Sequence, residues 1–336
     1  MPRFRGARQS QMTAPDLPAE LRAALEAKLE GLSRNDVAVR AASISQTYRE
    51  GGGSATIRDH TDALAYALAR MPATYAAAIA GLNALRESVR DFAPKSLLDI
   101  GAGPGTAAWA AAAAFPSLLN FTLLDANGAL RALALDLAGG SLRLRDLRYR
   151  LGEARAALAD AGPTDLVMAS YLTGEIGENE RRPLTELMWA KVRGALVIVE
   201  PGTPAGYGRI IALREQLIGA GAHVAAPCPH DGKCPIETPD WCHFTQRLPR
   251  LRAHKQVKGA ELPFEDEKFS YVALTRAPLA QRRLRVLAQP VVTKVEVAAK
   301  LCTPGGLALA KMPRRARTEY ARARRWRWGD AVMEEG

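Results

Sequence analysis

A short apolar segment, a glycine-rich turn and a helix-forming segment follow one another between residues 96 and 115. Ser96–Ile100 is the expected strand, the run Asp-Ile-Gly-Ala-Gly-Pro-Gly at 99–105 is the turn, and residues 106–115 are the helix. Parallel sheets bind nucleotides at such a turn, because glycines let the backbone approach a ligand and a helix N-terminus favours negative groups. The next expected strand ends in Asp125, placed to accept hydrogen bonds from ribose hydroxyls. The pattern predicts a nucleotide site, with a tight turn of packing glycines as the alternative.

The rest of the chain places this turn in an α/β core. Apolar strand-like and helix-forming segments alternate after it, with strands expected at 165–169 and 195–200 and helices at 130–138, 183–192 and 207–218. This alternation predicts a doubly wound parallel sheet. Residues 15–92 are expected to be helical, with a flexible break at 51–54 and a helix boundary near Pro72.

We therefore divide the chain into four parts. Residues 1–14 are expected to be a disordered basic tail, 15–92 a helical region, and 93–276 the core, which contains a cysteine segment at 227–243. Residues 277–336 are expected to form a basic extension of antiparallel strands, because 291–301 alternates in polarity and Gly305-Gly306 makes a turn. No apolar run reaches membrane-spanning length.

The spacing of the turn indicates which nucleotide it binds. It has the pattern D-x-G-x-G-x-G, whereas dinucleotide sites use G-x-G-x-x-G, so an NAD-dependent oxidoreductase is disfavoured. The pattern resembles the S-adenosylmethionine loop of class I methyltransferases, and this resemblance predicts cofactor contacts from the following residues: Asp99, Gly101, Ala102, Gly103, Gly105 and Asp125. Glu153, after a possible third strand, is either a neighbour of the adenine or a solvated surface acid.

The sequence names no catalytic residue. The segment 169–175 lacks the Asn/Asp-Pro-Pro-Tyr/Phe run of many amino-methylating enzymes, and residues 165–200 contain no cysteine nucleophile. Tyr171 and Glu175 are suited to acid–base work, or equally to capping the helix that follows. Enzyme activity therefore stays open.

Three of the four cysteines are clustered. Cys228, Cys234 and Cys242 have the spacing C-x5-C-x7-C, and Cys302 lies far downstream. Four thiolates are the ligand count of a four-iron cluster or of a closed zinc site. The neighbouring Pro, Gly, His and Asp residues are not typical of a hydrophobic core, so buried structural cysteines are disfavoured. Disulfides are disfavoured because nothing marks the chain as secreted. Zinc sites usually have shorter spacings between their cysteines. The pattern predicts a metal site and favours iron–sulfur over zinc without excluding zinc.

The positive charge of the chain is confined to its last third. Residues 1–240 hold 26 Lys and Arg and 26 Asp and Glu, whereas residues 241–336 hold 20 and 9, which accounts for the net charge of +11. A basic segment on a neutral body suggests a polyanion, and arginines with interleaved aromatic residues suit RNA. The predicted RNA-binding residues are Lys311, Arg314, Arg315, Arg317, Arg322, Arg324, Arg325 and Trp326. The alternative is a solvated helix whose tryptophans pack on the body.

These features together resemble the methyltransferase-like proteins associated with the mitochondrial small ribosomal subunit and their bacterial relatives. The resemblance rests on the segments ISQTYR (44–49), AYALARMPATY (65–75), LDIGAGPG (98–105) and VEPGTP (199–204), the three-cysteine run and the closing Trp-Gly-Asp (328–330). It implies a class I methyltransferase fold, a four-iron, four-sulfur cluster on the four cysteines, and binding to small-subunit RNA during assembly.

The leading hypothesis is an rRNA-binding assembly factor on an S-adenosylmethionine methyltransferase scaffold. An active rRNA methyltransferase is the first alternative. The expected partners are small-subunit rRNA and proteins, with no membrane, and the expected state is a monomer. Without a convincing presequence, the expected setting is the bacterial cytoplasm, or the mitochondrial matrix if the chain is eukaryotic.

Overall fold

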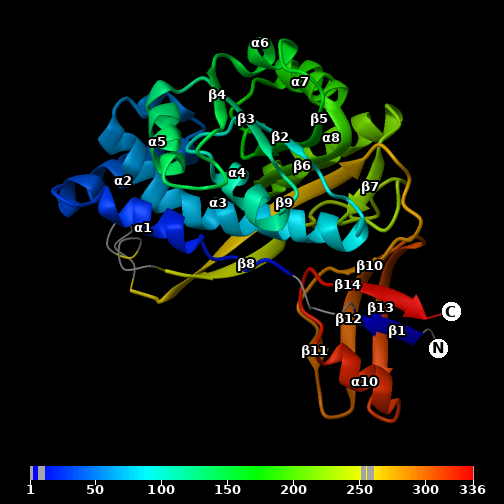
Figure 1. Cartoon of the computed structure of the whole chain (residues 1–336). Coiled ribbons are helices and arrows are strands. Elements are labelled where there is room, and N and C mark those ends of the chain that lie inside the picture. The colour runs from blue at the N-terminus through cyan, green and yellow to red at the C-terminus, as the bar shows by residue number, and fades with distance from the viewer. Residues whose placement is uncertain (1–2, 7–11, 251–254, 256–260, 336) are drawn as a thin grey trace.

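A large α/β core and a smaller β sheet make up the molecule (Figure 1). The computed structural model describes residues 3–6, 12–250, 255 and 261–335. The smaller sheet projects from one end of the core and carries the C-terminus. Among the described residues, no helix is both long and apolar enough to cross a bilayer.

The core sheet has the strand order β4-β3-β2-β5-β6-β9-β7, with β8 paired to β9. The strands from β4 to β6 are mutually parallel, whereas β9 runs antiparallel to both β6 and β7. Their bounds are β2 Ser96–Ile100, β3 Asn120–Asp125, β4 Arg148–Leu151, β5 Thr164–Ser170, β6 Val192–Pro201, β7 His223–Ala226, β8 Phe244–Pro249 and β9 Phe264–Thr275. This is the strand order of class I methyltransferases, so the predicted fold class is confirmed.

Alternate residues of the strands face two separate hydrophobic layers, as expected for a sheet covered on both sides. Leu97 belongs to one layer and Leu98 to the other. The first layer is covered by α1 Ala19–Ala27, α2 Arg34–Arg49, α3 His60–Ser88, α4 Thr106–Ala114 and α5 Gly128–Gly139. The second is covered by α6 Ala154–Ala159, α7 Glu178–Ala190 and α8 Pro204–Gly219. A short 3-10 helix, η1 (Ser54–Thr56), joins α2 to α3.

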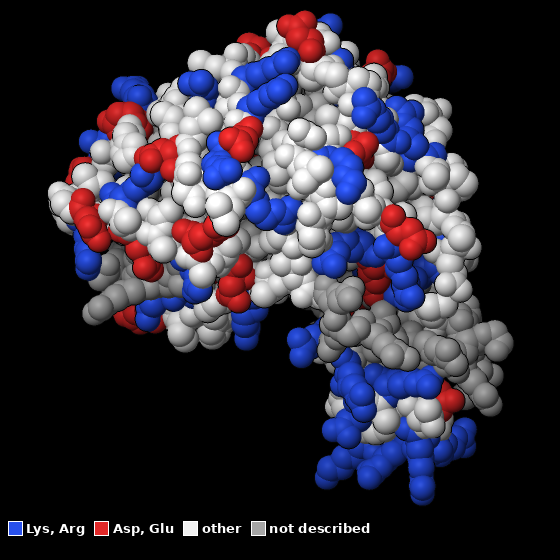
Figure 2. Space-filling model, viewed as in Figure 1, with Lys and Arg blue, Asp and Glu red and all other residues white. Residues whose placement is uncertain are grey.

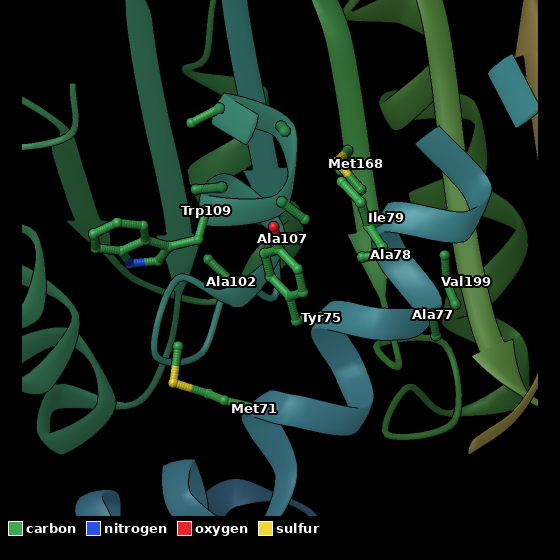
Figure 3. Close-up of a cluster of buried hydrophobic side chains, with 14 of the residues drawn as sticks. Met71, Tyr75, Ala77, Ala78, Ile79, Ala102, Ala107, Trp109, Met168 and Val199 are labelled. Atoms are coloured by element: carbon green, nitrogen blue, oxygen red, sulfur yellow. The ribbon is translucent and has the colours of Figure 1, made fainter. Parts of the chain in front are cut away.

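The long helix α3 passes under the glycine turn. Its Met71 and Tyr75 belong to the same buried cluster as Ala102 and Ala107 of the turn and of α4 (Figure 3). The helix boundary predicted near Pro72 is wrong, because α3 continues through this buried proline. Packing of the whole helix against the sheet stabilises it by more than the loss of one backbone hydrogen bond at proline costs.

The smaller sheet is formed by the C-terminal segment and the N-terminal strand. We call residues 277–335 the extension. Its elements are β10 Leu284–Val286, β11 Val291–Val292, β12 Glu296–Thr303, β13 Gly306–Pro313, α10 Arg317–Ala323 and β14 Ala331–Glu335. The predicted hairpin at Gly305-Gly306 is confirmed by the pairing of β12 with β13. Residues 3–6, expected in a disordered tail, instead form β1 (Arg3–Gly6), which pairs with β14 because that edge strand offers free backbone groups.

Candidate cofactor site, cysteine pocket and basic extension

The glycine turn has the backbone that its sequence requires. Gly101, Gly103 and Gly105 have φ of 66°, 52° and 81°, in the left-handed region that disfavours residues with a Cβ. A Cβ at Gly101 would also lie 2.7 Å from Leu172 Cδ1. The turn therefore depends on glycine for both conformation and space.

Asp125 ends β3 beside this turn and holds it in place. One carboxylate oxygen accepts a hydrogen bond from the Gly103 amide and the other from the Asn127 amide, both at 2.8 Å. A carboxylate has about four acceptor sites, so capacity for ribose hydroxyls remains. The Tyr149 hydroxyl donates to the Gly103 carbonyl at 2.6 Å. Sequence reasoning missed Tyr149, although it is the one buried residue of β4.

Asp99 is the most unusual group at this end of the sheet. It is 1% exposed, and neither carboxyl oxygen has a hydrogen-bond partner among the described residues. Burial raises the pKa of Asp99 to about 8, with a smaller contribution from Asp125. A buried polar group without a partner costs about 1–3 kcal/mol, so this carboxyl is suited to a ligand that brings a donor.

Glu153 and Ala102, the two other residues predicted to contact the cofactor, differ in how close they lie to the glycine turn. Glu153 is exposed at the N-cap of α6 and makes no capping hydrogen bond, which favours the surface-acid alternative. Ala102 lies in the turn and is 6% exposed.

Tyr171 and Glu175 follow β5 at the same edge of the sheet. Tyr171 is the one non-glycine residue with positive φ, 60°, among the described residues, and its hydroxyl donates to Glu267 at 2.7 Å. The Arg70 guanidinium lies 3.4 Å from the same carboxylate oxygen. Glu175 accepts a hydrogen bond from the Ser54 amide at 3.3 Å, and burial raises its pKa to about 7. Neither residue caps α7, whose N-cap is Gly177, so the capping alternative is wrong.

The four cysteines line one pocket. Cys228, Cys234 and Cys242 lie between β7 and β8 and are half-buried, and Cys302 comes from β12 of the extension and is buried. The site therefore joins the extension to the core. All four are free cysteines, so the disulfide alternative is not realised.

Two buried arginines hold the cysteine segment. Arg214 of α8 donates to the carbonyls of His230 and Gly232 at 2.8 and 2.9 Å. Arg285 of β10 donates to the carbonyl of Pro227 at 3.1 Å. Both side chains belong to residues that are at most 3% exposed. Sequence reasoning missed them, although Arg214 interrupts the apolar face that α8 turns to the core.

The pocket raises the pKa values of its thiols. Burial is the main cause for Cys228, Cys242 and Cys302, and the charges of neighbouring cysteines add to it. For Cys302 the pKa rises to about 12. Such thiols stay protonated at neutral pH unless a cation binds, and metal binding would displace their protons.

The four thiols match a four-iron cluster and a zinc site equally in number. Although the four thiols line one pocket, no group of three or more His, Cys, Asp or Glu in the described part of the chain is placed to hold one metal ion. Zinc requires four ligands converging on one point at about 2.3 Å, whereas a four-iron cluster spreads four thiolates over separate irons. The residues fit this group in number and chemistry, and its identity stays a prediction.

The basic residues of the extension lie mostly on its surface. Figure 2 shows Lys and Arg gathered over the extension with few acids between them. Arg322 is half-buried, and the exposed members of the predicted set are Lys311, Arg314, Arg315, Arg317, Arg324 and Arg325. Trp326 is 4% exposed and packs with Met312, Ala323 and Val332. The indole completes the small core of the extension, which favours the alternative that the tryptophan packs on the protein, and RNA contact by Trp326 stays a prediction.

A wide cleft lies between the extension and the core. Its volume is about 1020 Å³, and it is lined from the extension by Arg325, Arg327 and Trp328. Phe244 and Arg247 of β8 line it from the core. The cleft thus combines aromatic and basic side chains with the acidic Glu87, Asp266 and Asp330.

Comparisons with known proteins identify a family and several relatives of this chain. A family model described as mitochondrial small ribosomal subunit Rsm22 matches residues 60–333. The human mitochondrial ribosome assembly protein METTL17 is 29% identical over 288 residues, which cover 80% of this chain and 62% of that protein. The mitochondrial Rsm22-cox11 tandem protein 2 of Schizosaccharomyces pombe is 30% identical over 191 residues, 52% of this chain and 25% of that protein. The chain thus spans less than two thirds of these relatives.

Similar solved structures include methyltransferases. Magnesium protoporphyrin IX methyltransferase from Synechocystis PCC 6803 with bound SAM is 12% identical, with a TM-score of 0.40, and the match covers 74% of this chain and 99% of that chain. Precorrin-6y C5,15-methyltransferase from Geobacter metallireducens is 15% identical, with a TM-score of 0.39, covering 58% and 87%. These likenesses are distant, and it is the strand order of the core that establishes the fold. Because the family model spans most of the chain, this protein belongs to the family described as mitochondrial small ribosomal subunit Rsm22.

Proposed function

We propose that this protein binds rRNA and assists assembly of the small ribosomal subunit, using a methyltransferase scaffold. The family match and the human relative named as a ribosome assembly protein support this proposal. The observation that carries it is the separation of charge, since a neutral core bears an extension whose exposed arginines face solvent. Small-subunit rRNA and proteins are the partners, in the bacterial cytoplasm or, for a eukaryotic chain, in the mitochondrial matrix.

The test is cosedimentation with small-subunit particles, comparing the wild-type protein with a variant in which arginines of residues 277–336 are replaced by alanine. Substituting Arg314, Arg315 and Arg325 by Ala should release the protein from the particle at a lower salt concentration, because phosphate contacts release counterions. Equal release of both proteins would remove the extension as the binding surface.

The cofactor proposed for the glycine turn is S-adenosylmethionine. The unpartnered Asp99 carboxyl and the free acceptor capacity of Asp125 suit its ammonium group and ribose hydroxyls. When bound, the cofactor supplies an activated methyl group. Asp125→Ala should weaken its binding by about 1.5–3 kcal/mol, the cost of removing a hydrogen bond to a charged group. Isothermal titration with S-adenosylmethionine and NAD tests both the strength and the choice of ligand.

For the cysteine pocket we propose a four-iron, four-sulfur cluster on Cys228, Cys234, Cys242 and Cys302. The single pocket and its four thiols support it. When bound, the cluster supplies a covalent link between the core and the extension. Anaerobic purification followed by iron, sulfide and zinc assays decides between a cluster and zinc.

Active rRNA methylation is a second candidate function. The strained backbone of Tyr171 favours it, because such conformations concentrate at functional sites. Its half-buried side chain lies at the edge of the sheet where the cofactor is expected. Transfer of labelled methyl groups to small-subunit rRNA by the wild type, abolished in Tyr171→Phe, would support an enzyme. If the wild-type protein transfers no methyl group, subunit assembly is the remaining proposed function.

A further inference from the structure

The connection between α2 and α3 is tied to both sides of the glycine turn. On one side, the Asn127 side-chain amide donates to the carbonyls of Ser54 and Ile57 at 2.8 and 2.9 Å. On the other side, the Glu175 carboxylate accepts from the Ser54 amide at 3.3 Å. Ser54 is therefore held from two directions through its own carbonyl and amide.

The strand order shows what lies between these two ties. Asn127 follows β3 and Glu175 follows β5, and β2, which leads into the glycine turn, is hydrogen-bonded between these two strands. Neighbouring strands lie about 4.8 Å apart, so Asn127 and Glu175 flank the end of β2. Because both side chains bond Ser54, this residue lies across the end of β2, beside the glycine turn.

The glycines of the segment allow this close crossing. A Cβ at Gly53 would lie 2.8 Å from Glu175 Oε2. Gly51 has φ of 83°, which turns the chain at the end of α2 toward the site. The run Gly51-Gly52-Gly53 thus gives the segment both its approach and its freedom to move.

Unpartnered polar atoms are found on the elements that meet at this end of the sheet. Thr56 in the segment, Asp99 at β2 and Ser170 at the end of β5 each have a buried side-chain oxygen without a hydrogen-bond partner among the described residues. Buried polar groups are normally paired, so their presence on three adjoining elements points to a polar ligand between the segment and the turn.

We infer that the segment 51–57 is a movable cover for the cofactor site, latched by Asn127 on one side and Glu175 on the other. The inference rests on the proposed function, since the ligand it covers is of the S-adenosylmethionine class, an amino acid joined to a nucleoside through sulfur. Opening admits the ligand and closure excludes water, as loop covers do in many nucleotide sites. The helical N-terminal region is then part of the binding site.

Two variants loosen the cover without changing the glycine turn. Asn127→Ser removes the amide donor but keeps the capping oxygen that accepts from the Leu130 amide. Gly53→Ala places a methyl group against Glu175. Gly128→Ala is the matched control, because a Cβ there meets nothing within 4 Å.

The experiment measures association and dissociation of S-adenosylhomocysteine on the immobilised full chain, together with hydrogen exchange of the amides at 54–57 without ligand. Both loosened variants should bind and release the ligand at least threefold faster than wild type and exchange faster, while Gly128→Ala matches wild type. Faster release with unchanged or slower association would overturn the inference, because the residues would then hold the ligand directly. If the wild type does not bind S-adenosylhomocysteine, the proposed cofactor is wrong, and hydrogen exchange of the amides at 54–57 alone tests the cover. Unchanged exchange in both variants would then overturn the inference of a movable cover.

Discussion

Arg285 of the extension donates a hydrogen bond to the carbonyl of Pro227, the residue directly before Cys228, at 3.1 Å. A second bond joins the same guanidinium to the Gly329 carbonyl at 2.8 Å. One buried cation therefore fixes the start of the cysteine segment relative to the closing Trp-Gly-Asp run. Two ion pairs strengthen the junction, Arg282 with Asp231 and Arg283 with Glu87. The extension is attached to the core through arginines as well as through Cys302.

Cys302→Ser tests the contribution of the thiol to this junction. We expect the variant to lose the visible absorbance of the proposed cluster and to be cleaved by trypsin within the extension, because metal sites contribute folding free energy. Absorption spectra and timed digestion of anaerobically purified protein measure both effects. Thr303→Ser, which keeps the hydroxyl that bonds the Gly306 carbonyl, is the control. A wild-type spectrum and digestion pattern in Cys302→Ser would exclude this thiol as a ligand.

Asp99 predicts a pH dependence of stability in the absence of cofactor. Its pKa is raised from 3.8 to about 8 in the folded protein, so the folded state holds this proton more tightly than the unfolded chain. The free energy of unfolding should therefore fall as the pH rises between these two values. Asp99→Asn should be more stable than wild type at pH 9 but bind S-adenosylmethionine more weakly, a trade-off typical of functional sites. Urea denaturation at pH 5, 7 and 9 checks the slope; parallel curves for both proteins would contradict the shift.

Trp326→Ala should affect stability rather than RNA recognition. Removing a buried tryptophan costs about 3–5 kcal/mol, and here the cost falls on the small core shared with Met312 and Val332. Thermal unfolding and hydrogen exchange of β12 and β13 measure the effect. Trp326→Phe should retain most of the stability and the whole RNA affinity. A stable Trp326→Ala protein with weakened RNA binding would restore base stacking by this residue.

The glycine turn and the sheet were predictable from sequence because their signals are local. A strand, a left-handed glycine turn and a helix are encoded within residues 96–115, and the structure has each of them there. The four cysteines stand out by rarity and spacing, and the structure brings them to one pocket.

The parts that sequence reasoning missed depend on contacts distant in the chain. Arg214 and Arg285 bond carbonyls of the cysteine segment, and these distant partners cannot be identified from the residues adjacent in sequence. The arginines around Trp326 are typical of an RNA-binding segment, and only the structure decides that its indole is buried, as the packing alternative expected. Pro72 predicts a helix end because its local propensity is strong, and the packing of α3 overrides it.

The exposed arginines of the extension predict a steep salt dependence of RNA binding. Changing Arg314, Arg315, Arg324 and Arg325 to Ala should flatten the slope of log affinity against log salt by about 0.7–0.9 for each phosphate that is no longer neutralised. The glycine turn lies in the neutral core, so cofactor binding should stay unchanged. Arg182→Ala with Arg193→Ala, exposed arginines of the core, is the matched control and should keep the wild-type slope. Filter binding of small-subunit rRNA fragments from 50 to 300 mM salt, roughly the range where such contacts weaken, measures it. If the control flattens the slope as much as the extension variant, RNA binds the basic residues of the whole surface, and the extension has no special role.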